Sequence, residues 1–214
     1  MTDIDWDDVY VESEISTPVR DSGQTGPGIS WWHGRGLTRT YGEGSDGAGE
    51  PVDRTILRMN GIVVDRWTAR NCVYEALDAI SVDYEKLAAA VFETDSNDLR
   101  KEVEDLLEMP AARVVFIDRA SLEPRFRGRG GIGRVLIGHI LSQLMGDVDS
   151  VAVTYPHPFE LEHGDPSVDI EVRKVRQVWE SIGFTPVDDD VWIMDSASTA
   201  HSKAIASFEG RLGI

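Results

Sequence analysis

Residues 120–137 read Ala120-Ser-Leu-Glu-Pro-Arg-Phe-Arg-Gly-Arg-Gly-Gly-Ile-Gly-Arg-Val-Leu-Ile137 and decide the expected fold. They join the end of an apolar run, Arg113 to Leu122, to a glycine-rich loop and then to a segment whose apolar residues recur in two adjacent helical rows. The pattern predicts a buried strand, a tight loop and a helix buried over a wide face. Such a loop directs unpaired backbone N–H groups and the positive helix end at one spot, so we expect an anion site from Arg127 to Gly133.

The charge around this loop is opposite in sign to the charge of the chain. The 214 residues carry 38 acidic and 21 basic side chains, a formal net charge of −17. Between residues 113 and 140 there are only two acids, Asp118 and Glu123. The same stretch holds six arginines: Arg113, Arg119, Arg125, Arg127, Arg129 and Arg134. This local excess of positive charge predicts attraction for phosphate groups.

Three interpretations of the loop compete. A Walker-type phosphate loop is excluded because no Gly-Lys-Ser/Thr sequence follows. The spacing Gly128-x-Gly130-x-x-Gly133 formally matches a dinucleotide-binding pattern. In that pattern, however, an acid should end the following strand, where this chain has Thr154 and Tyr155, so a nicotinamide-dependent enzyme is a distant third hypothesis. A purely structural turn explains the glycines but not the arginines.

Working outward from the loop, apolar periodicity predicts further helices and strands. Upstream, two β-rich runs from Thr55 to Trp67 flank Asn60-Gly61, a dipeptide favoured in tight turns, and predict a hairpin. Helices are expected near 68–80, 83–93 and 97–108. Downstream, the pattern predicts a strand at 150–155, an amphipathic helix at 172–182, and a last strand or hairpin at 184–194.

The ends of the chain differ in composition from its middle. Residues 1–54 form an acidic, glycine-rich N-terminal extension, expected to be partly mobile at 23–28 and 42–49. Alternation around Val9 to Ile15 predicts one short strand, and Trp31-Trp32 is expected to pack onto the domain because exposed indoles are costly. The expected organisation is therefore an extension at 1–54, a domain at 55–196, and a tail or short helix at 197–214.

The run from Ala120 to Ile137 resembles a motif of the GNAT superfamily of N-acetyltransferases, in which an apolar residue, any residue and Pro precede Arg/Gln-x-x-Gly-x-Gly/Ala and a helix. Val178-Trp-Glu-Ser-Ile-Gly-Phe184 is similar to that family's final helix, which ends in Gly-Phe. The resemblance covers roughly Arg113 to Asp195. It implies an α/β (α+β) fold: a GNAT-like mixed, splayed β-sheet flanked by helices, with acetyl-CoA between the strands at 113–122 and 150–155.

The resemblance also implies an activity. An amine would attack the thioester of acetyl-CoA directly, which makes the chain an expected N-acyltransferase; a non-catalytic acyl-CoA-binding module of the same fold is the alternative. The loop amides would hold the pyrophosphate and the strand backbone near Leu122 the thioester end. The implied cofactor-binding residues are Leu122, Arg127, Gly128, Arg129, Gly130, Gly131, Ile132, Gly133 and Arg134.

The chain departs from the family pattern at two places. The segment from Arg127 to Gly133 is one residue longer than usual, so either the loop bulges at Gly130-Gly131 or Arg127 plays a different part. Trp179 stands where the family commonly has a tyrosine that protonates the leaving thiolate, and an indole cannot act as that acid. The proton transfers must therefore be assigned to other side chains.

Four side chains are candidates for these transfers: Asp118, Glu123, Tyr155 and His157. Tyr155 is the preferred substitute acid because a phenol can donate a proton. Each candidate has a structural alternative. The two carboxylates can simply pair with Arg119 or Arg125, and His157 can be an ordinary turn residue between two prolines.

Composition limits the partners. The negative charge disfavours nucleic acid and anionic lipid, and no apolar run approaches the ~20 residues of a membrane span. Cys72 is the only cysteine, which excludes an intrachain disulfide and favours a cytoplasmic protein. The segment His157 to His163 lacks the HExxH order, so no metal is expected. We expect an amine-bearing small molecule or protein as acceptor, and a homodimer is possible. Many acids with few lysines fit a halophile or, equally, a high-GC genome.

Overall fold

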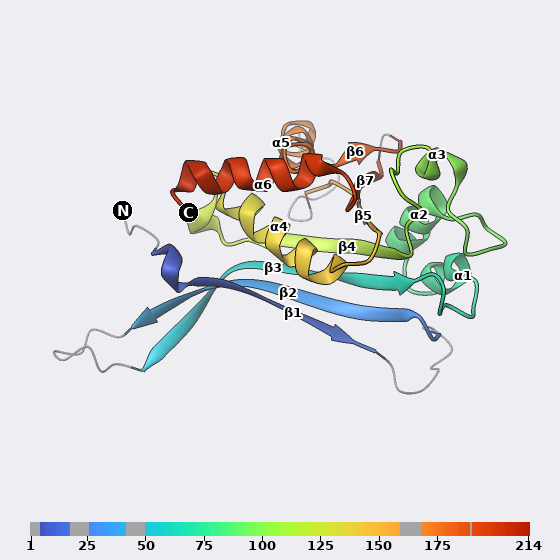
Figure 1. The fold of residues 1–214 in the computed structure, drawn as a ribbon, viewed down its shortest axis with the longest axis horizontal. Helices are drawn as coiled ribbons and strands as arrows, with labels where there is room; N and C mark the ends of the chain where they lie inside the picture. The colour runs from blue at the N-terminus through green and yellow to red at the C-terminus, as the bar shows by residue number, and fades with distance from the viewer. Residues whose placement is uncertain (1–4, 18–25, 42–49, 159–167, 189) are drawn as a thin grey trace.

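The computed structural model describes residues 5–17, 26–41, 50–158, 168–188 and 190–214. These residues form a seven-stranded mixed sheet flanked by helices, which confirms the expected α/β fold class (Figure 1). In chain order the elements are η1 (Trp6–Asp8), β1 (Val9–Ser16), β2 (Ile29–Tyr41), β3 (Pro51–Asp65), α1 (Val73–Asp78), α2 (Val82–Val91), α3 (Lys101–Glu104), β4 (Arg113–Leu122), η2 (Pro124–Phe126), α4 (Ile132–Met145), β5 (Ser150–Thr154), α5 (Val168–Glu180), β6 (Thr185–Pro186), β7 (Trp192–Asp195) and α6 (Thr199–Leu212).

The sheet has the order β1-β2-β3-β4-β5-β7-β6. Strands β1 to β4 pair antiparallel, β4 and β5 pair parallel, and β5, β7 and β6 pair antiparallel. A parallel pair cannot be closed by a tight turn and needs a crossover connection, which here contains α4. The strand, loop and helix read from the sequence therefore form the crossover at the centre of the sheet.

Each face of the sheet carries its own hydrophobic core. Along β4, Val115 and Ile117 pack with α4, whereas Val114 and Phe116 pack with α1 and α2. Side chains alternate between faces along a strand, so a strand covered on both sides reads as a continuous apolar run. Helices α4 and α6 therefore cover one face of the sheet, and α1 and α2 cover the other face (Figure 1).

The hairpin expected at Asn60-Gly61 is wrong. β3 runs unbroken from Pro51 to Asp65, and the register of β3 against β4 shifts between Asn60 and Gly61 because β4 has one extra residue, Asp118, at that point. Gly61 has a tertiary role instead of a turn role. A Cβ there would overlap the carbonyl oxygen of Phe116 and crowd the indole nitrogen of Trp32. Glycine permits close approach of backbone and side chain in the strand.

The other expected elements are largely present. The second helix, the strand at 150–155, the amphipathic helix, the last hairpin and the C-terminal helix correspond to α2, β5, α5, β6–β7 and α6. The first and third helices are shorter than expected, as α1 and α3. An isolated antiparallel bridge between Phe92 and Leu99 draws the chain into a loop where the third helix was expected to begin.

The segment expected to be an extension contributes strands to the sheet. The predicted short strand near the start is β1, and β2 follows it within the first 54 residues. Trp32 is fully buried and Trp31 is half-buried edge-on against Tyr84, which confirms that the pair packs onto the domain. The expected boundary at 54/55 falls inside β3. Of the glycine-rich stretches, residues 42–49 and 23–25 lie outside the described residues, whereas residues 26–28 lie within them.

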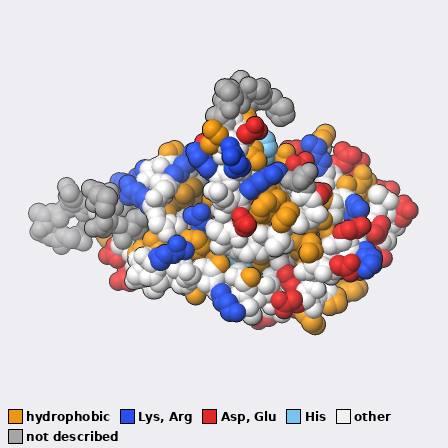
Figure 2. All heavy atoms as spheres, turned by 90° about the horizontal axis from the view of Figure 1, so that it is seen from above, with side chains coloured by type: hydrophobic (Ala, Val, Ile, Leu, Met, Phe, Trp, Pro, Cys, Tyr) orange, Lys and Arg blue, Asp and Glu red, His pale blue; other side chains and the backbone are white. Residues whose placement is uncertain are grey.

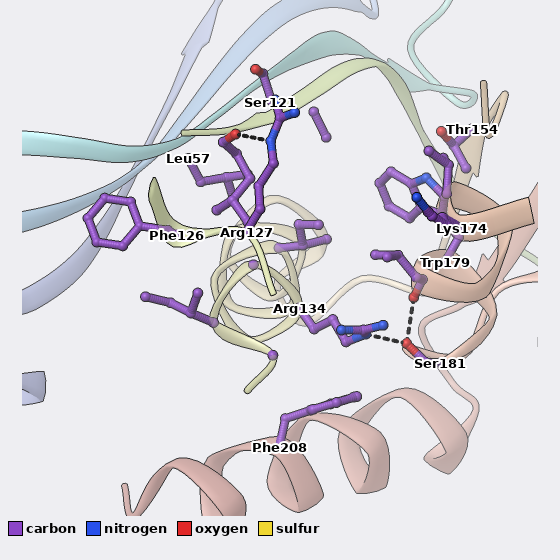
Figure 3. A pocket seen from close by; sticks show the side chains of 18 of the residues that line it. Leu57, Ser121, Phe126, Arg127, Arg134, Thr154, Lys174, Trp179, Ser181 and Phe208 are labelled. Carbon is purple, nitrogen blue, oxygen red and sulfur yellow. Dashed lines mark hydrogen bonds between the residues drawn. The ribbon is translucent and has the colours of Figure 1, made fainter. Parts of the chain in front are cut away.

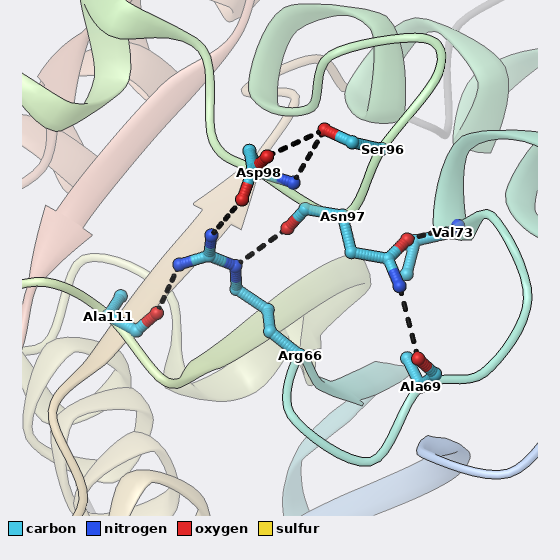
Figure 4. Close-up of polar contacts among 7 residues, drawn as sticks. All are labelled: Arg66, Ala69, Val73, Ser96, Asn97, Asp98 and Ala111. Carbon is cyan, nitrogen blue, oxygen red and sulfur yellow. Dashed lines mark hydrogen bonds and ion pairs between the residues drawn. The ribbon is translucent and has the colours of Figure 1, made fainter.

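A buried arginine joins the loops at the end of β3 (Figure 4). Arg66 donates from Nε to the carbonyl of Asn97 (2.9 Å) and from Nη1 to the carbonyl of Ala111 (2.6 Å). Asn97 in turn accepts from the backbone N–H of Val73, which starts α1, and donates to the carbonyl of Ala69. Burial lowers the pKa of Arg66. The side chains of Arg66 and Asn97 thus supply hydrogen-bond partners to backbone groups of the loops and of the first residue of α1. These bonds hold the short helix α1 in place.

Candidate active site

The sheet opens between β4 and β5. Pairing joins Arg113–Ile117 to Ser150–Thr154, after which β5 ends while β4 continues to Leu122. The backbone N–H of Glu123 donates to Ile56 on β3 (2.9 Å), so the polar groups of the preceding Leu122 face the opposite, open edge. The strand therefore offers hydrogen-bonding backbone to whatever enters the split.

The glycine loop closes one end of this split. Gly130 and Gly131 have φ of 62° and 110°, a region that disfavours side chains, and Gly131 caps α4. Gly128, with φ of 73°, is a third left-handed residue of the loop. Among the described residues, the backbone N–H groups of Gly128, Arg129, Gly130, Gly131 and Gly133 donate to no acceptor. The positive end of α4 and these unpaired donors converge on one place, which can hold an anion.

A cavity of about 1370 Å³ runs along the split, and its lining includes Leu122 and the whole loop from Arg127 to Arg134. Six basic side chains and two carboxylates lie among its lining residues: Arg119, Arg127, Arg129, Arg134, Lys174 and Arg211, with Asp118 and Glu171. Basic side chains gather over the middle of this face, whereas many of the acidic ones lie toward the end that carries α1 to α3 (Figure 2). The cavity is thus basic within an acidic protein.

The arginines of the loop have different neighbours. Arg127 donates from Nε to the carbonyl of Leu122 (3.0 Å), which ties the loop to the open edge of β4. Arg129 lies over the ring of Phe126. Arg134 donates from Nε to the hydroxyl of Ser181 (2.6 Å), and its pKa is lowered mainly by burial and further by the charge of Arg211.

The two walls of the cavity come from distant parts of the chain (Figure 3). Leu57, Ser121, Phe126 and Arg127 lie on the side of β4 and the loop, and Thr154, Lys174, Trp179 and Ser181 lie on the side of β5 and α5. Trp179 is buried and packs edge-on against Phe184. Figure 3 also places Phe208 of α6 beside Arg134.

Three of the four candidate catalytic residues line this cavity and one does not. Asp118, at the extra position of β4, accepts a hydrogen bond from the amide of Asn60 (2.9 Å). Tyr155 and His157 stack with ring centroids 5.4 Å apart. Glu123 does not line the cavity. Its carboxylate lies 3.5 Å from the guanidinium of Arg58, so it forms an ion pair, although with Arg58 and not with Arg119 or Arg125.

The surroundings of Tyr155 favour its protonated form. Burial raises the pKa of its phenol most, and the carboxylates of Asp190 and Asp83 raise the pKa further, against a lowering effect of Arg176. The phenol therefore keeps its proton at neutral pH and can act as a donor. The same carboxylates make this end of the cavity more negative than the loop end.

Sequence reasoning missed several lining residues, among them Thr154, Lys174, Ser181, Phe208 and Arg211, and it missed Asn60, which holds Asp118. No local pattern could bring α6, and Phe208 with it, to the glycine loop. Lys174 lies on the amphipathic helix, and its Nζ lies 2.6 Å from the carboxylate of Glu171. The three-residue spacing of this pair can be read from the sequence, but the cavity that the pair lines cannot.

Within the described parts of the chain, no group of three or more His, Cys, Asp or Glu side chains could hold a metal ion. No helix among those residues has the length and apolar character needed to cross a bilayer. Cys72 is a free cysteine whose thiol donates to the carbonyl of Thr94 (3.3 Å).

No protein-family model, no curated protein and no solved structure matches this chain.

Proposed function

We propose that this protein is a cytoplasmic N-acyltransferase, of the kind found in the GNAT superfamily, that transfers an acetyl group from acetyl-CoA to an amine. One observation carries the proposal: the open edge of β4 beyond Ile117 leads directly to the unpaired amides at the start of α4. Acetyl-CoA has an amide-containing arm that suits a strand edge and a diphosphate that suits those amides.

The two ends of the cavity differ in charge in the way this reaction needs. Arg127, Arg129 and Arg134 lie at the loop end. Asp118 and Tyr155 follow the paired residues Ile117 and Thr154, and the phenol of Tyr155 feels the charges of Asp83 and Asp190. The loop end suits the phosphates of acetyl-CoA, and the other end suits a cationic amine on a small molecule or a protein. This polarity supports an amine as the acceptor.

In the proposed reaction the acceptor nitrogen attacks the thioester carbonyl carbon, a C–N bond forms and the C–S bond breaks. Asp118, held by the amide of Asn60, would take the proton that the ammonium group must lose before attack. Tyr155 would donate its phenolic proton to the leaving thiolate and recover one from the acylated nitrogen. Positioning of the two substrates in the split would supply most of the acceleration.

One observation favours a second candidate function. Trp179 lines the cavity where the resembled family has its acid, and its indole cannot protonate a thiolate. If Tyr155 cannot substitute for it, the protein is a non-catalytic module that binds acyl-CoA. The two functions share the binding site and differ only in turnover.

Calorimetric titration with acetyl-CoA and with NADH, in low and in molar salt, tests the binding step. The proposal predicts saturable binding of acetyl-CoA and no binding of NADH. If acetyl-CoA bound neither in low nor in molar salt, the proposal would be overturned. Gly133→Val adds a side chain against Leu122 at the cavity wall and should weaken binding by at least ten-fold. Gly210→Ala, where an added Cβ has no neighbour within 4 Å, is the matched control.

Release of free CoA thiol in the presence of small amines and lysine-containing peptides then separates the two candidates. Turnover with any amine supports the transferase. Binding without thiol release across the amines tested supports the non-catalytic module.

A further inference from the structure

The last turn of α6 lies directly on the glycine loop. A Cβ on Gly131 would lie 2.6 Å from the ring of Phe208, and one on Gly130 would lie 3.0 Å from the side chain of Leu212. Phe208 and Arg211 both line the cavity. The C-terminal helix therefore extends the anion site beyond the loop itself.

Two guanidinium groups share the ring of Phe208. The guanidinium carbon of Arg134 lies 5.1 Å from the ring centroid and that of Arg211 lies 4.1 Å from it. Neither group forms an ion pair with a carboxylate of the described residues. Arg134 donates to the Ser181 hydroxyl, and Arg211 donates to the Ser207 carbonyl in its own helix. Like charges gathered without a counter-charge repel each other and are stabilised when an anion binds between them.

The position of Arg134 strengthens this argument. It lies in the first turn of α4, where the helix dipole disfavours a cation. Its guanidinium is also partly desolvated, which lowers its pKa, and Arg211 lowers it further. A bound dianion would reverse both effects because it would meet the helix amino terminus and the two guanidinium groups together.

We propose that Arg134 and Arg211, whose guanidinium groups both lie over the ring of Phe208, bind the phosphate on the ribose of CoA, next to the pyrophosphate held by the glycine loop. The inference rests on the proposed function. The diphosphate is assigned to the loop amides with Arg127 and Arg129, which leaves Arg134 of α4 and Arg211 of α6 for the third phosphate. A phosphomonoester carries about 1.5 to 2 negative charges at pH 7 and accepts from planar guanidinium donors.

The test compares acetyl-CoA with acetyl-dephospho-CoA, which lacks only the ribose phosphate, by calorimetry on the full chain. Wild-type protein should bind acetyl-CoA at least about ten-fold more tightly. Arg211→Gln should weaken acetyl-CoA binding by about that factor and leave acetyl-dephospho-CoA unchanged, so the preference disappears. Arg211→Lys should retain part of the preference, since it keeps the charge but not the planar donor pair.

Arg125→Gln is the matched control. Arg125 also lies over a phenylalanine ring, that of Phe126 at 4.7 Å, and its loss changes the net charge equally, but it does not line the cavity. The preference for acetyl-CoA should survive in this variant. Arg211 is exposed, so its replacement should leave thermal unfolding unchanged, which is checked by circular dichroism.

Each other outcome is decisive. Equal wild-type affinity for the two ligands, or equal weakening of both by Arg211→Gln, would overturn the assignment of the ribose phosphate and leave acetyl-CoA binding intact. Binding of neither ligand by the wild-type protein would overturn the proposed function and this inference with it.

Discussion

The indole N–H of Trp32 on β2 donates to the backbone carbonyl of Phe116 on β4, 3.0 Å away, across the intervening strand β3. The contact is possible because Gly61 of β3 has no side chain to fill the space. Trp32 is fully buried, so the Phe116 carbonyl has no access to water there. The pair couples three strands at the point where the register of β3 against β4 shifts.

Trp32→Phe should lower the free energy of unfolding by about 1–3 kcal/mol, because it leaves the buried carbonyl of Phe116 without this donor. Urea unfolding followed by fluorescence measures the change. Trp67→Phe is the control: Trp67 is 75% exposed, and its replacement should change stability by less than about 0.5 kcal/mol. Equal effects of the two replacements would contradict the role of the Trp32 hydrogen bond.

Gly61→Ala should be more damaging than its single added carbon suggests. The new Cβ overlaps a backbone oxygen, which cannot rotate away, so we expect a loss of about 3 kcal/mol or an insoluble protein. Gly210→Ala, at an exposed position in the last turn of α6, should instead stabilise by up to about 0.5–1 kcal/mol through helix propensity. A tolerated Gly61→Ala variant would mean that Trp32 and β4 can move apart.

Asn97→Ala removes the side chain that accepts from the N–H of Val73 and donates to the carbonyls of Ala69 and Asn71. We expect a loss of about 1–3 kcal/mol, together with faster hydrogen exchange at the start of α1 than in β4. Ser96→Ala removes a hydroxyl that donates to the carboxylate of Asp98 and accepts from its backbone N–H, both in a solvent-exposed turn, and should change stability by less than the Asn97 replacement does. Unchanged exchange in α1 would contradict the anchoring role of Asn97.

Tyr84→Phe should change stability mainly at alkaline pH. The hydroxyl is buried without a hydrogen-bond partner among the described residues, and burial, with the charge of Asp118 second, raises the pKa of Tyr84. Below about pH 10 the phenol is protonated in both states; above it, ionisation favours the unfolded chain. The wild-type protein should therefore lose stability as pH rises above about 10, and the Tyr84→Phe variant should lose less.

Unfolding in urea at pH 8, 10 and 11 checks this prediction. At pH 8 the variant should be as stable as wild type or slightly more stable, because the removed hydroxyl made no hydrogen bond. Tyr41→Phe, at a ring that is 57% exposed, is the control and should leave the pH dependence unchanged. Parallel stability curves for wild type and Tyr84→Phe above pH 10 would refute the prediction.

Tyr155→Phe should reduce turnover by about 100-fold or more and leave acetyl-CoA affinity unchanged, since the phenol is proposed to donate a proton and not to hold the ligand. Because the pKa of Tyr155 is raised, its phenol stays protonated up to at least about pH 10, and wild-type turnover should not fall below that pH through loss of this proton. Thiol release and calorimetry on the same samples measure both quantities. Tyr74→Phe, outside the cavity lining, is the control. Full turnover in Tyr155→Phe would assign the proton donor elsewhere.

Much of the fold followed from local pattern. The apolar run of β4, the glycine loop and the two rows of α4 predicted the strand, loop and helix, and helical spacing predicted α2 and α5. For residues 197–214 the expectation was a tail or short helix, and they form α6. These elements could be predicted because their periodicity is set by neighbours a few residues away. The basic loop in an acidic chain could be predicted for the same reason, since its arginines are close in sequence.

Only the tertiary structure decided the rest, because the contacts join residues far apart in the chain. Asn60-Gly61 has the local chemistry of a turn, yet Trp32 and Phe116 hold it in a continuous strand. The first 54 residues looked like an extension, but β1 and β2 pair with β3 and are part of the sheet.

The candidate site divides in the same way. The sequence by itself predicted the candidate anion site at the glycine loop, because the backbone donors and the charges of this loop lie within one short segment. It could not separate Asp118 and Tyr155, which line the cavity, from Glu123, which pairs with Arg58. Nor could it bring Arg211 of α6 beside Arg134 of α4, because that contact depends on how the two helices pack, and packing is fixed by the shape of the whole core.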